Sequence, residues 1–205
     1  MIAVIDCGVG NLMSVHKALE FIGCEAQVSS DAEFIKSCDA VVLPGVGAFA
    51  DAMKQLRSTG MDRVVKHVIK DGTPFLGICL GLQLLYEYSE EGGEVEGLGI
   101  MSGVIRRFPS NMELKIPHMG WNCLSSTEGK TLFKGLEALP YVYFVHSYYL
   151  ESSRKENVCA ECEYGVSFDA AIEQQNVFAT QFHPEKSGRV GLAILKNWTN
   201  TIIKA

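Results

Sequence analysis

The chain has no long apolar run and no excess of basic residues. No hydrophobic stretch reaches the roughly 18 residues that a membrane-spanning helix needs, and no basic segment precedes the strand-like residues 1–5. We therefore expect neither a signal peptide nor a membrane span. Its 18 Lys and Arg against 24 Asp and Glu give a formal charge of -6, which argues against nucleic acid or an anionic membrane as a partner.

A disulfide framework is also missing from the pattern. Seven cysteines at irregular spacing, an odd number, favour reduced thiols and so a cytoplasmic location. Cys159 and Cys162 have the spacing of a zinc knuckle, but no second pair accompanies them, so we predict a plain strand there and expect no metal or other cofactor. No repeat, low-complexity tract or linker interrupts the chain, and we expect one domain over residues 1–205.

The first half alternates short apolar runs with amphipathic ones. Strands are predicted at residues 2–5, 25–28, 40–43 and just before residue 79, and helices at 12–22, 31–37, 51–56 and 61–70. This alternation, with short connections, predicts a parallel sheet covered by helices on both faces. Gly8-Val9-Gly10 resembles part of a dinucleotide fingerprint, but the third glycine is missing, and a glycine-assisted turn is the better interpretation.

The second half has a different character. Short strand-like segments lie at 103–108, 121–124, 141–149, 157–164, 170–173 and 177–182, with a turn signal at Gln175-Asn176. They predict antiparallel strands that extend or flank the parallel sheet, and residues 191–203 predict a closing amphipathic helix.

Cys79 stands in a stretch with the layout of a nucleophile elbow, a sharp turn between a strand and a helix. Gly77 and Gly81, two positions before and after it, leave room for the strand and the helix-compatible run 82–88 to close around the side chain. The N-terminus of that helix favours negative charge and therefore a thiolate. Taken alone, the stretch is equally typical of a buried structural cysteine.

His183 is the best base for such a cysteine among the five histidines. It ends the predicted strand 177–182 and precedes Pro184, which holds the residue before it in extended geometry. His183 and Glu185 can then project to the same side, so that the carboxylate holds one ring nitrogen while the other faces the sulfur. His16 and His67 fall within predicted helices and are most simply surface residues.

A glycine-flanked segment, Pro44-Gly45-Val46-Gly47, follows the predicted strand before the elbow strand. Loops at the carboxyl ends of neighbouring parallel strands line one crevice. The N–H of Leu80, next to the nucleophile, is one donor for an oxyanion, and the N–H of Val46 is the best candidate for a second. A turn that needs glycines only for its backbone is the alternative.

Three motifs together, GICLGLQ (77–83), PGVG (44–47) and FHPE (182–185), resemble the class I (triad) glutamine amidotransferases over nearly the whole chain. Within that class, IPHMGWN (116–122), YFVHSY (143–148) and HPEKS (183–187) are similar to the glutaminase subunits of imidazole glycerol phosphate synthases. The resemblance implies an α/β, flavodoxin-like fold with an open, mostly parallel sheet flanked by helices and with antiparallel strands added in the second half.

The resemblance also implies a reaction. Cys79 attacks the side-chain amide of L-glutamine, His183 carries protons and Glu185 orients it; ammonia leaves, and a thioester is hydrolysed to glutamate. Backbone donors at Val46 and Leu80 hold the oxyanion in a loop whose glycines permit a peptide flip. The residues implied to bind glutamine are Gln83, Glu91, Gly47, His146, Ser147 and Tyr148.

A partner is implied as well. It is the cyclase subunit, a (β/α)8 barrel that forms a heterodimer with this chain and uses the ammonia to make imidazole glycerol phosphate and AICAR in histidine biosynthesis. From pattern alone Met119 and Trp121 indicate a core strand and Lys186 a solvated side chain, but with the resemblance we favour an interface. The residues expected there are Pro117, His118, Met119, Gly120, Trp121, Asn122 and Lys186.

Three rival functions stay open. A paralogous glutaminase subunit could serve surface-sugar amidination with the same chemistry. A non-catalytic regulatory module is opposed by the intact Cys79, His183 and Glu185. A cysteine protease of similar fold would lack Gln83 and the run 146–148.

Overall fold

The computed structural model describes residues 1–8 and 11–202. Val9 and Gly10 of the predicted glycine turn, and Ile203 at the end of the predicted closing helix, lie outside the described residues. Within them no helix is both long enough and apolar enough to cross a bilayer.

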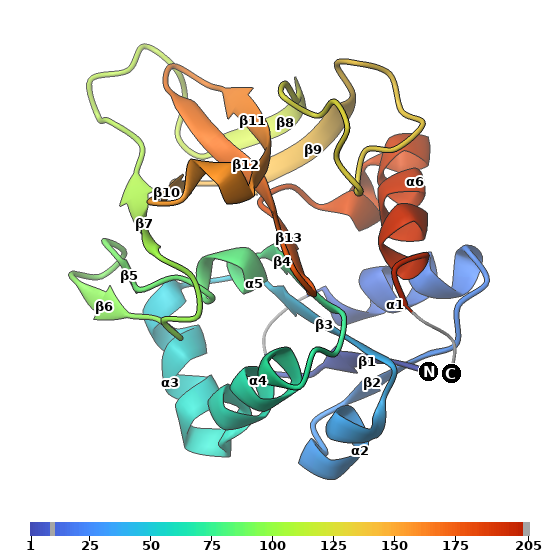
Figure 1. Cartoon of the computed structure of the whole chain (residues 1–205). Coiled ribbons are helices and arrows are strands. Elements are labelled where there is room, and N and C mark those ends of the chain that lie inside the picture. The colour runs from blue at the N-terminus through green and yellow to red at the C-terminus, as the bar shows by residue number, and fades with distance from the viewer. Residues whose placement is uncertain (9–10, 203–205) are drawn as a thin grey trace.

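Among the described residues, a mixed sheet of eleven strands runs through the molecule (Figure 1), in the order β2-β1-β3-β4-β13-β12-β10-β7-β5-β6, with β11 beside β12. Neighbouring strands are parallel from β2 to β13 and antiparallel from β13 to β7. The parallel strands are β1 (Ile2–Ile5), β2 (Ala26–Ser29), β3 (Ala40–Gly45), β4 (Phe75–Cys79) and β13 (Val177–Thr180). The others are β5 (Tyr88–Ser89), β6 (Val95–Glu96), β7 (Gly103–Arg107), β10 (Tyr148–Ser152), β11 (Val158–Glu163) and β12 (Ser167–Gln174). The predicted fold class is confirmed.

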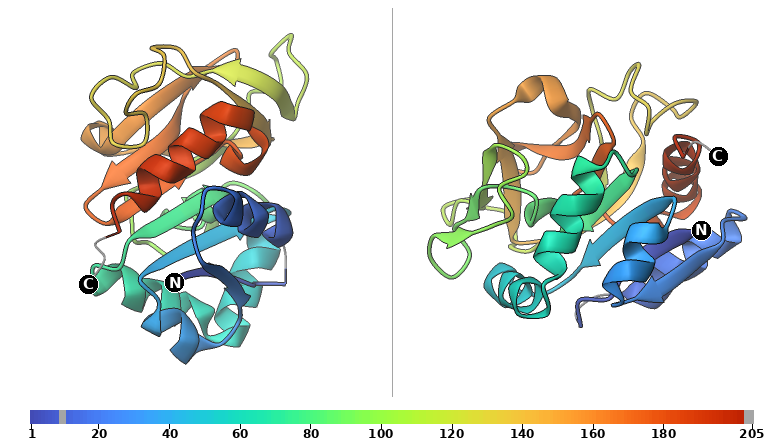
Figure 2. Two further views of the ribbon diagram at one scale, coloured as in Figure 1. Left: turned by 90° about the vertical axis from the view of Figure 1, so that its right-hand side faces the viewer. Right: turned by 60° about the horizontal axis from the view of Figure 1, so that its bottom comes forward.

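Helices cover both faces of the parallel half (Figures 1 and 2). In β1, Ala3 and Ile5 pack into one apolar cluster and Ile2 and Val4 into another, because successive side chains of a strand point to opposite faces. The first cluster lies under α2 (Ala32–Ser37), α3 (Phe49–Thr59) and α4 (Met61–Lys70), and the second under α1 (Leu12–Phe21) and α6 (Gly188–Thr199). Because both faces are buried, the sequences of these strands are continuous apolar runs.

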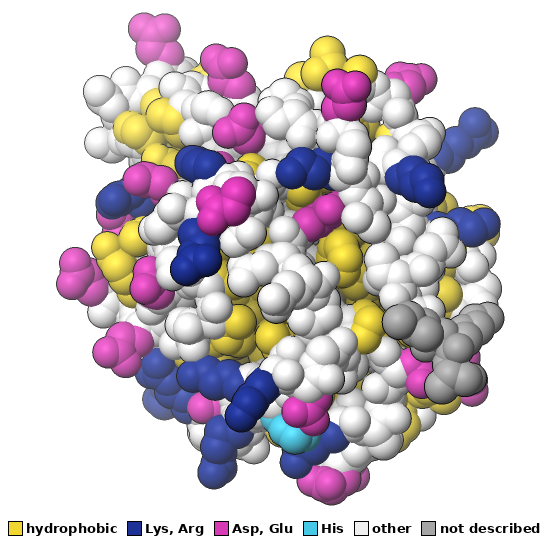
Figure 3. Space-filling view, in the orientation of Figure 1, with side chains coloured by type: hydrophobic (Ala, Val, Ile, Leu, Met, Phe, Trp, Pro, Cys, Tyr) yellow, Lys and Arg dark blue, Asp and Glu magenta, His cyan; other side chains and the backbone are white. Residues whose placement is uncertain are grey.

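A second, two-stranded sheet pairs β8 (His118–Cys123) with β9 (Tyr141–His146) in antiparallel register. Val142 and Phe144 of β9 are fully buried in the same cluster that α1 and α6 cover. The small sheet therefore packs on the α6 side of the large one. The face in Figure 3 mixes acidic and basic side chains, with Lys and Arg gathered over α3 and α4, so the negative net charge is not concentrated there.

The helix predicted at 82–88 is wrong: α5 (Leu80–Gln83) is a single turn. The carbonyl groups that would continue it accept hydrogen bonds from the returning segment 97–101 instead. Leu98 N donates to Leu84 O at 2.9 Å, and Gly97 N donates to Glu87 O at 2.8 Å. Long-range pairing thus replaces the helical ladder.

Two predicted strands are also divided or shortened. The strand predicted at 141–149 breaks at Ser147, because β9 pairs with β8 while β10 pairs with β7 and β12. β13 ends at Thr180 rather than at residue 182, and His183 N donates to Tyr143 O of β9 at 3.0 Å. The chain therefore crosses from the large sheet to the small one just before His183. The other predicted elements lie within a few residues of their predicted bounds, whereas the two-residue strands β5 and β6 were not predicted.

Candidate active site

Cys79 is the last residue of β4 and has a conformation that L-residues rarely adopt, with φ 54° and ψ -109°. Backbone strain of this kind costs about 1–3 kcal/mol and is concentrated at functional sites. The predicted elbow is confirmed. Its helix is one turn long, however, so the helix dipole contributes little to a thiolate here.

The two glycines around the elbow are there for steric reasons. A Cβ built on Gly81 would lie 1.8 Å from Leu43 O, and one on Gly77 would lie 2.8 Å from Gly81 O. No side chain fits either gap, because both neighbours are backbone atoms. The sequence argument that strand and helix close tightly around Cys79 is therefore confirmed.

His183 and Glu185 meet beside Cys79. His183 Nδ1 lies 2.8 Å from Glu185 Oε1, and the two side chains are 2% and 1% exposed. His183 Nε2 is buried without a hydrogen-bond partner among the described residues. Burial lowers the pKa of His183, but the adjacent Cys79 sulfur and Glu185 carboxylate raise it more, to about 9. The arrangement favours a protonated His183 between the Cys79 sulfur and the Glu185 carboxylate.

A pocket of about 400 Å³ opens next to Cys79. It brings together residues from the loop after β3, the end of β4, α5, the loop after β5, the segment before β8 and the junction of β9 with β10. Every residue predicted to hold the oxyanion or the glutamine lines it: Val46, Gly47, Leu80, Gln83, Glu91, His146, Ser147 and Tyr148.

The two predicted oxyanion donors lie side by side. Gly45 of β3 pairs in register with Cys79 of β4, so the next residues, Val46 and Leu80, leave neighbouring strand ends at the same edge. Gly47 has φ 102°, which other residues rarely adopt. The loop conformation therefore depends on glycine at this position.

Gln181 is a site residue that sequence reasoning missed. Its side chain is fully buried, with Nε2 3.6 Å from Cys79 Sγ and Oε1 3.0 Å from Gln83 Nε2. Gln83 Nε2 also donates to Tyr148 O at 3.2 Å. The only sequence signal was its place two residues before His183, where the predicted strand next to the elbow ends.

Glu91 lies at the rim of the pocket and closes the first turn of α3. Its Oε2 accepts a hydrogen bond from Phe49 N at 2.9 Å, and its own N–H donates to Ser89 Oγ at 3.1 Å. It is the one carboxylate among the described residues that line this pocket.

Comparison with known proteins agrees with this geometry. The sequence model of the family "Glutamine amidotransferase class-I" matches residues 3–201, nearly the entire chain. The chain belongs to the class-I glutamine amidotransferase family.

The most similar curated members of this family include two bacterial proteins named "Imidazole glycerol phosphate synthase subunit HisH". The one from Caldanaerobacter subterraneus subsp. tengcongensis is 51% identical over 202 residues, covering 98% of each chain. The one from Geobacillus thermodenitrificans is 49% identical over 206 residues, covering 98% of this chain and 96% of the relative.

Solved structures show the same amidotransferase fold at low identity. "Structure of PurLQS from Thermotoga maritima" aligns with a TM-score of 0.76 and 19% identity over 98% of both chains. "Crystal structure of glutamine amidotransferase" aligns with a TM-score of 0.73 and 20% identity, covering 97% of this chain and 100% of the other.

The PHMGWN run of this amidotransferase has two different faces. Met119 and Trp121 are 61% and 56% exposed, whereas His118 is 3% exposed. Strand alternation in β8 explains the difference, since every second side chain points inward. The side chain of His118, which was expected at the partner interface, is instead buried within this chain, and the amide of Asn122 is engaged with Glu163 O at 2.9 Å.

The remaining predicted interface residues lie around this face. Pro117 is exposed and also lines the pocket beside Cys79, and Gly120 is half-buried. Lys186 is exposed, with its Nζ 5.9 Å from the centre of the Tyr143 ring.

His118 instead supports the pocket from behind. Its Nδ1 lies 3.0 Å from His146 Nε2, and His146 Nδ1 lies 2.8 Å from Tyr148 O. A carbonyl only accepts, so His146 Nδ1 donates to it and the other nitrogen accepts from His118. Burial lowers the pKa of His146 to about 3 and that of His118 to about 4, so both rings are neutral.

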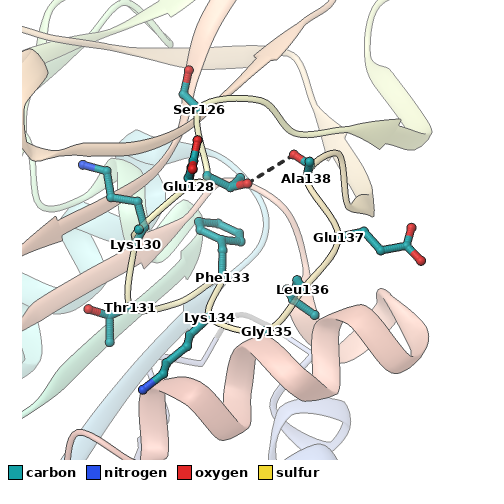
Figure 4. Close-up of a pocket in the computed structure, with 12 residues that line it drawn as sticks. Ser126, Glu128, Lys130, Thr131, Phe133, Lys134, Gly135, Leu136, Glu137 and Ala138 are labelled. Carbon is teal, nitrogen blue, oxygen red and sulfur yellow. Dashed lines mark hydrogen bonds between the residues drawn. The ribbon is translucent and has the colours of Figure 1, made fainter.

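A larger, open cavity of about 930 Å³ lies away from Cys79 and is lined by the loop of residues 126–138 (Figure 4). Phe133 points into the loop while Lys134 and Glu137 point away from it. Thr127 Oγ1 donates to Ala138 O across the loop at 3.3 Å. No predicted catalytic residue lines this cavity, and the smaller pocket at Cys79 is the candidate active site.

Proposed function

We propose that this chain is the glutaminase subunit of an imidazole glycerol phosphate synthase. It hydrolyses L-glutamine to glutamate and ammonia and passes the ammonia to a cyclase subunit, a (β/α)8 barrel, in histidine biosynthesis. The observation that carries the proposal is one pocket at Cys79, backed by His183 and Glu185, that holds every residue expected to bind glutamine. Relatives with this subunit name, about half identical over nearly their whole length, support it.

The geometry gives each triad member a step. The Cys79 thiolate attacks the side-chain amide carbon, and the carbonyl oxygen takes up the negative charge, which the N–H groups of Val46 and Leu80 stabilise. Protonated His183 gives its proton to the departing nitrogen, which leaves as ammonia, and a thioester remains. His183 then takes a proton from water, the water oxygen attacks the thioester, and the thiolate leaves as glutamate forms. Glu185 holds the imidazole throughout.

The pocket also fits the other end of the substrate. Glu91 supplies a carboxylate for the positively charged α-amino group of glutamine. Gln83 uses its amide nitrogen within the protein, and its Oε1 makes no hydrogen bond with a described residue, so this oxygen can accept from the substrate. His146, Ser147 and Tyr148 form the opposite wall.

The partner binds, in this proposal, on the exposed face of the small sheet. Met119 and Trp121 of β8 lie there, and Tyr141 of β9 is 57% exposed as well. Large apolar and aromatic side chains are enriched at interface centres. Lys186, beside this face, pairs with a carboxylate of the cyclase.

The rival functions have weaker support. The relatives' names favour histidine biosynthesis over surface-sugar amidination. The assembled pocket and triad speak against a non-catalytic module. A single domain and a cytoplasmic location stay predictions.

The deciding experiment measures glutamate release from glutamine by the chain alone and with the cognate cyclase, with and without the nucleotide ligand of the cyclase. We expect little release by the chain alone and strong release with the liganded partner. Cys79→Ala should lower the stimulated rate by at least about 10⁴-fold, because no nucleophile remains. Cys24→Ala, which removes a half-buried cysteine outside the pocket, should keep the stimulated rate of the wild type.

Two results would count against the proposal. Stimulated hydrolysis that survives in Cys79→Ala would show that another group attacks the amide. No hydrolysis by the wild-type chain with the liganded cyclase would show that this chain does not serve that partner.

A further inference from the structure

Gln181 lies between the nucleophile and the pocket wall. Its side chain is fully buried, and its backbone N–H donates to Ala170 O of β12 at 2.8 Å, which ties the residue to the sheet. Its two amide ends have two different neighbours, Cys79 Sγ at 3.6 Å and Gln83 Nε2 at 3.0 Å. A buried amide held at both ends has a defined direction.

The hydrogen bonds determine which end faces the sulfur. Tyr148 O can only accept, so the atom of Gln83 that contacts it is the amide nitrogen. That nitrogen also donates to Gln181, whose facing atom is therefore the oxygen. The NH₂ group of Gln181 then points at Cys79 Sγ.

We propose that Gln181 is a further functional residue: its side-chain N–H donates to the Cys79 sulfur, stabilises the thiolate and holds it in place for attack. This inference rests on the proposed function, in which the deprotonated sulfur attacks glutamine. A donor to the charged form of a group favours that form, and hydrogen bonds to an ionised acceptor are about twice as strong as neutral ones. The single helical turn after Cys79 contributes little of its own, so this donor acts on the sulfur in addition to His183.

Gln83 has a second role as a consequence. It lines the substrate pocket and, by holding Gln181 Oε1, keeps the NH₂ group of Gln181 directed at the sulfur. The substrate contact and the nucleophile thus share one hydrogen-bond chain from Tyr148 O to Cys79 Sγ.

The test is the pH dependence of Cys79 alkylation by iodoacetamide in the full chain, followed by mass spectrometry of the peptide that contains Cys79. Gln181→Met keeps the length of the side chain and removes the donor. We expect the midpoint of the alkylation profile to rise by about one pH unit, a tenfold loss of thiolate below the midpoint.

Gln174→Met is the matched control. Gln174 lies on β12 and also has its amide oxygen engaged, with Asn157 Nδ2 at 2.7 Å, but it does not contact Cys79. Its midpoint should equal that of the wild type. Gln181→Glu keeps an acceptor for Gln83 and places a carboxylate at the sulfur, so it should raise the midpoint further than Gln181→Met.

An unchanged midpoint in Gln181→Met would overturn the inference. If circular dichroism shows that this variant does not fold, Gln181→Leu, which also has no donor and adds no charge, decides in its place by the same criterion. The readout needs neither glutamine nor a partner. A shifted midpoint in a chain that hydrolyses no glutamine would refute the proposed function alone, whereas hydrolysis with an unshifted midpoint would refute the role of Gln181 alone.

Discussion

At the scale of single residues, the pairing of charges around His183 determines what the site can do. The imidazole is almost fully buried, which by itself would favour the neutral ring. The adjacent sulfur and the Glu185 carboxylate reverse that preference and raise the pKa of His183 to about 9. The proton needed by the departing ammonia is therefore in place at neutral pH.

This pKa predicts the alkaline limb of the activity. Because His183 is protonated below pH about 9 and neutral above it, kcat/KM of the partner-stimulated reaction should fall as pH rises through that value. Glu185→Gln removes one group that raises the pKa, so its falling limb should lie at lower pH, and its rate should drop by roughly 10²–10⁴-fold. The measurement is a pH–rate profile of the intact complex.

The exposed Glu94→Gln is the control for the loss of one carboxylate and should keep the wild-type profile. A Glu185→Gln limb at the wild-type position would contradict the assigned role of Glu185, even if the rate fell.

At the scale of elements, the small sheet connects its exposed face to the backbone of His183. Trp121 of β8 is paired in register with Tyr143 of β9. Tyr143 O accepts the backbone N–H of His183 at 3.0 Å, and Tyr143 N donates to Ser187 Oγ at 2.9 Å. A partner bound on β8 is thus separated from the backbone of His183 by one strand.

Because the side chains of β8 alternate between two faces, we expect substitutions on the exposed face to change partner affinity and substitutions on the inner face to change stability. Trp121→Ala, on the exposed face, should weaken cyclase binding by about 2 kcal/mol, roughly 30-fold, with little change in thermal stability. His118→Ala, on the inner face, should lower the melting temperature, because it removes a ring stacked on Tyr164 and leaves His146 Nε2 without its donor. Calorimetric titration with the cyclase and thermal unfolding measure the two effects.

Phe21→Ala is the matched control for losing a large exposed side chain. Phe21 is 78% exposed at the end of α1. It lies near the start of β2, whereas the pocket lies where the parallel strands β3 and β4 end. Equal losses of affinity in Phe21→Ala and Trp121→Ala would contradict the proposed interface.

At the scale of the whole molecule, two apolar cores share the strands of one sheet. Ile5 and Leu43 face the α3 side, while Val4 and Val42 face the α6 side. Neither core can open without exposing strands that the other uses. From this sharing we predict that the chain folds as one unit.

Unfolding in denaturant should therefore be one cooperative transition. Trp121→Phe leaves Trp198, which is fully buried on α6, as the sole tryptophan reporter of one core. Its fluorescence and far-ultraviolet circular dichroism should share one midpoint. Two separate midpoints would show that the halves unfold independently and would contradict a single domain.

Local sequence patterns were sufficient to predict those features of the site that residues close in sequence form among themselves. The glycines around Cys79 and the sequence His183-Pro184-Glu185 specify a turn and a pair of side chains through backbone sterics alone, and the structure has both. The β/α alternation likewise predicted the parallel half, because continuous apolar runs are what a sheet buried on both faces requires.

Tertiary structure decided what depends on distant segments. Gln181 and Cys79 are 102 residues apart, and only the pairing of β4 with β13 brings the amide to the sulfur. The same holds for His118, whose inward direction is set by the register of β8 on β9. The helix after the elbow is short because its carbonyl groups bond to residues 97–101. A strand or helix propensity contains no information about which distant backbone will supply the competing hydrogen bond. The sequence by itself therefore determined the elbow and the His183–Glu185 pair, and the fold decided how they meet and that Gln181 joins them.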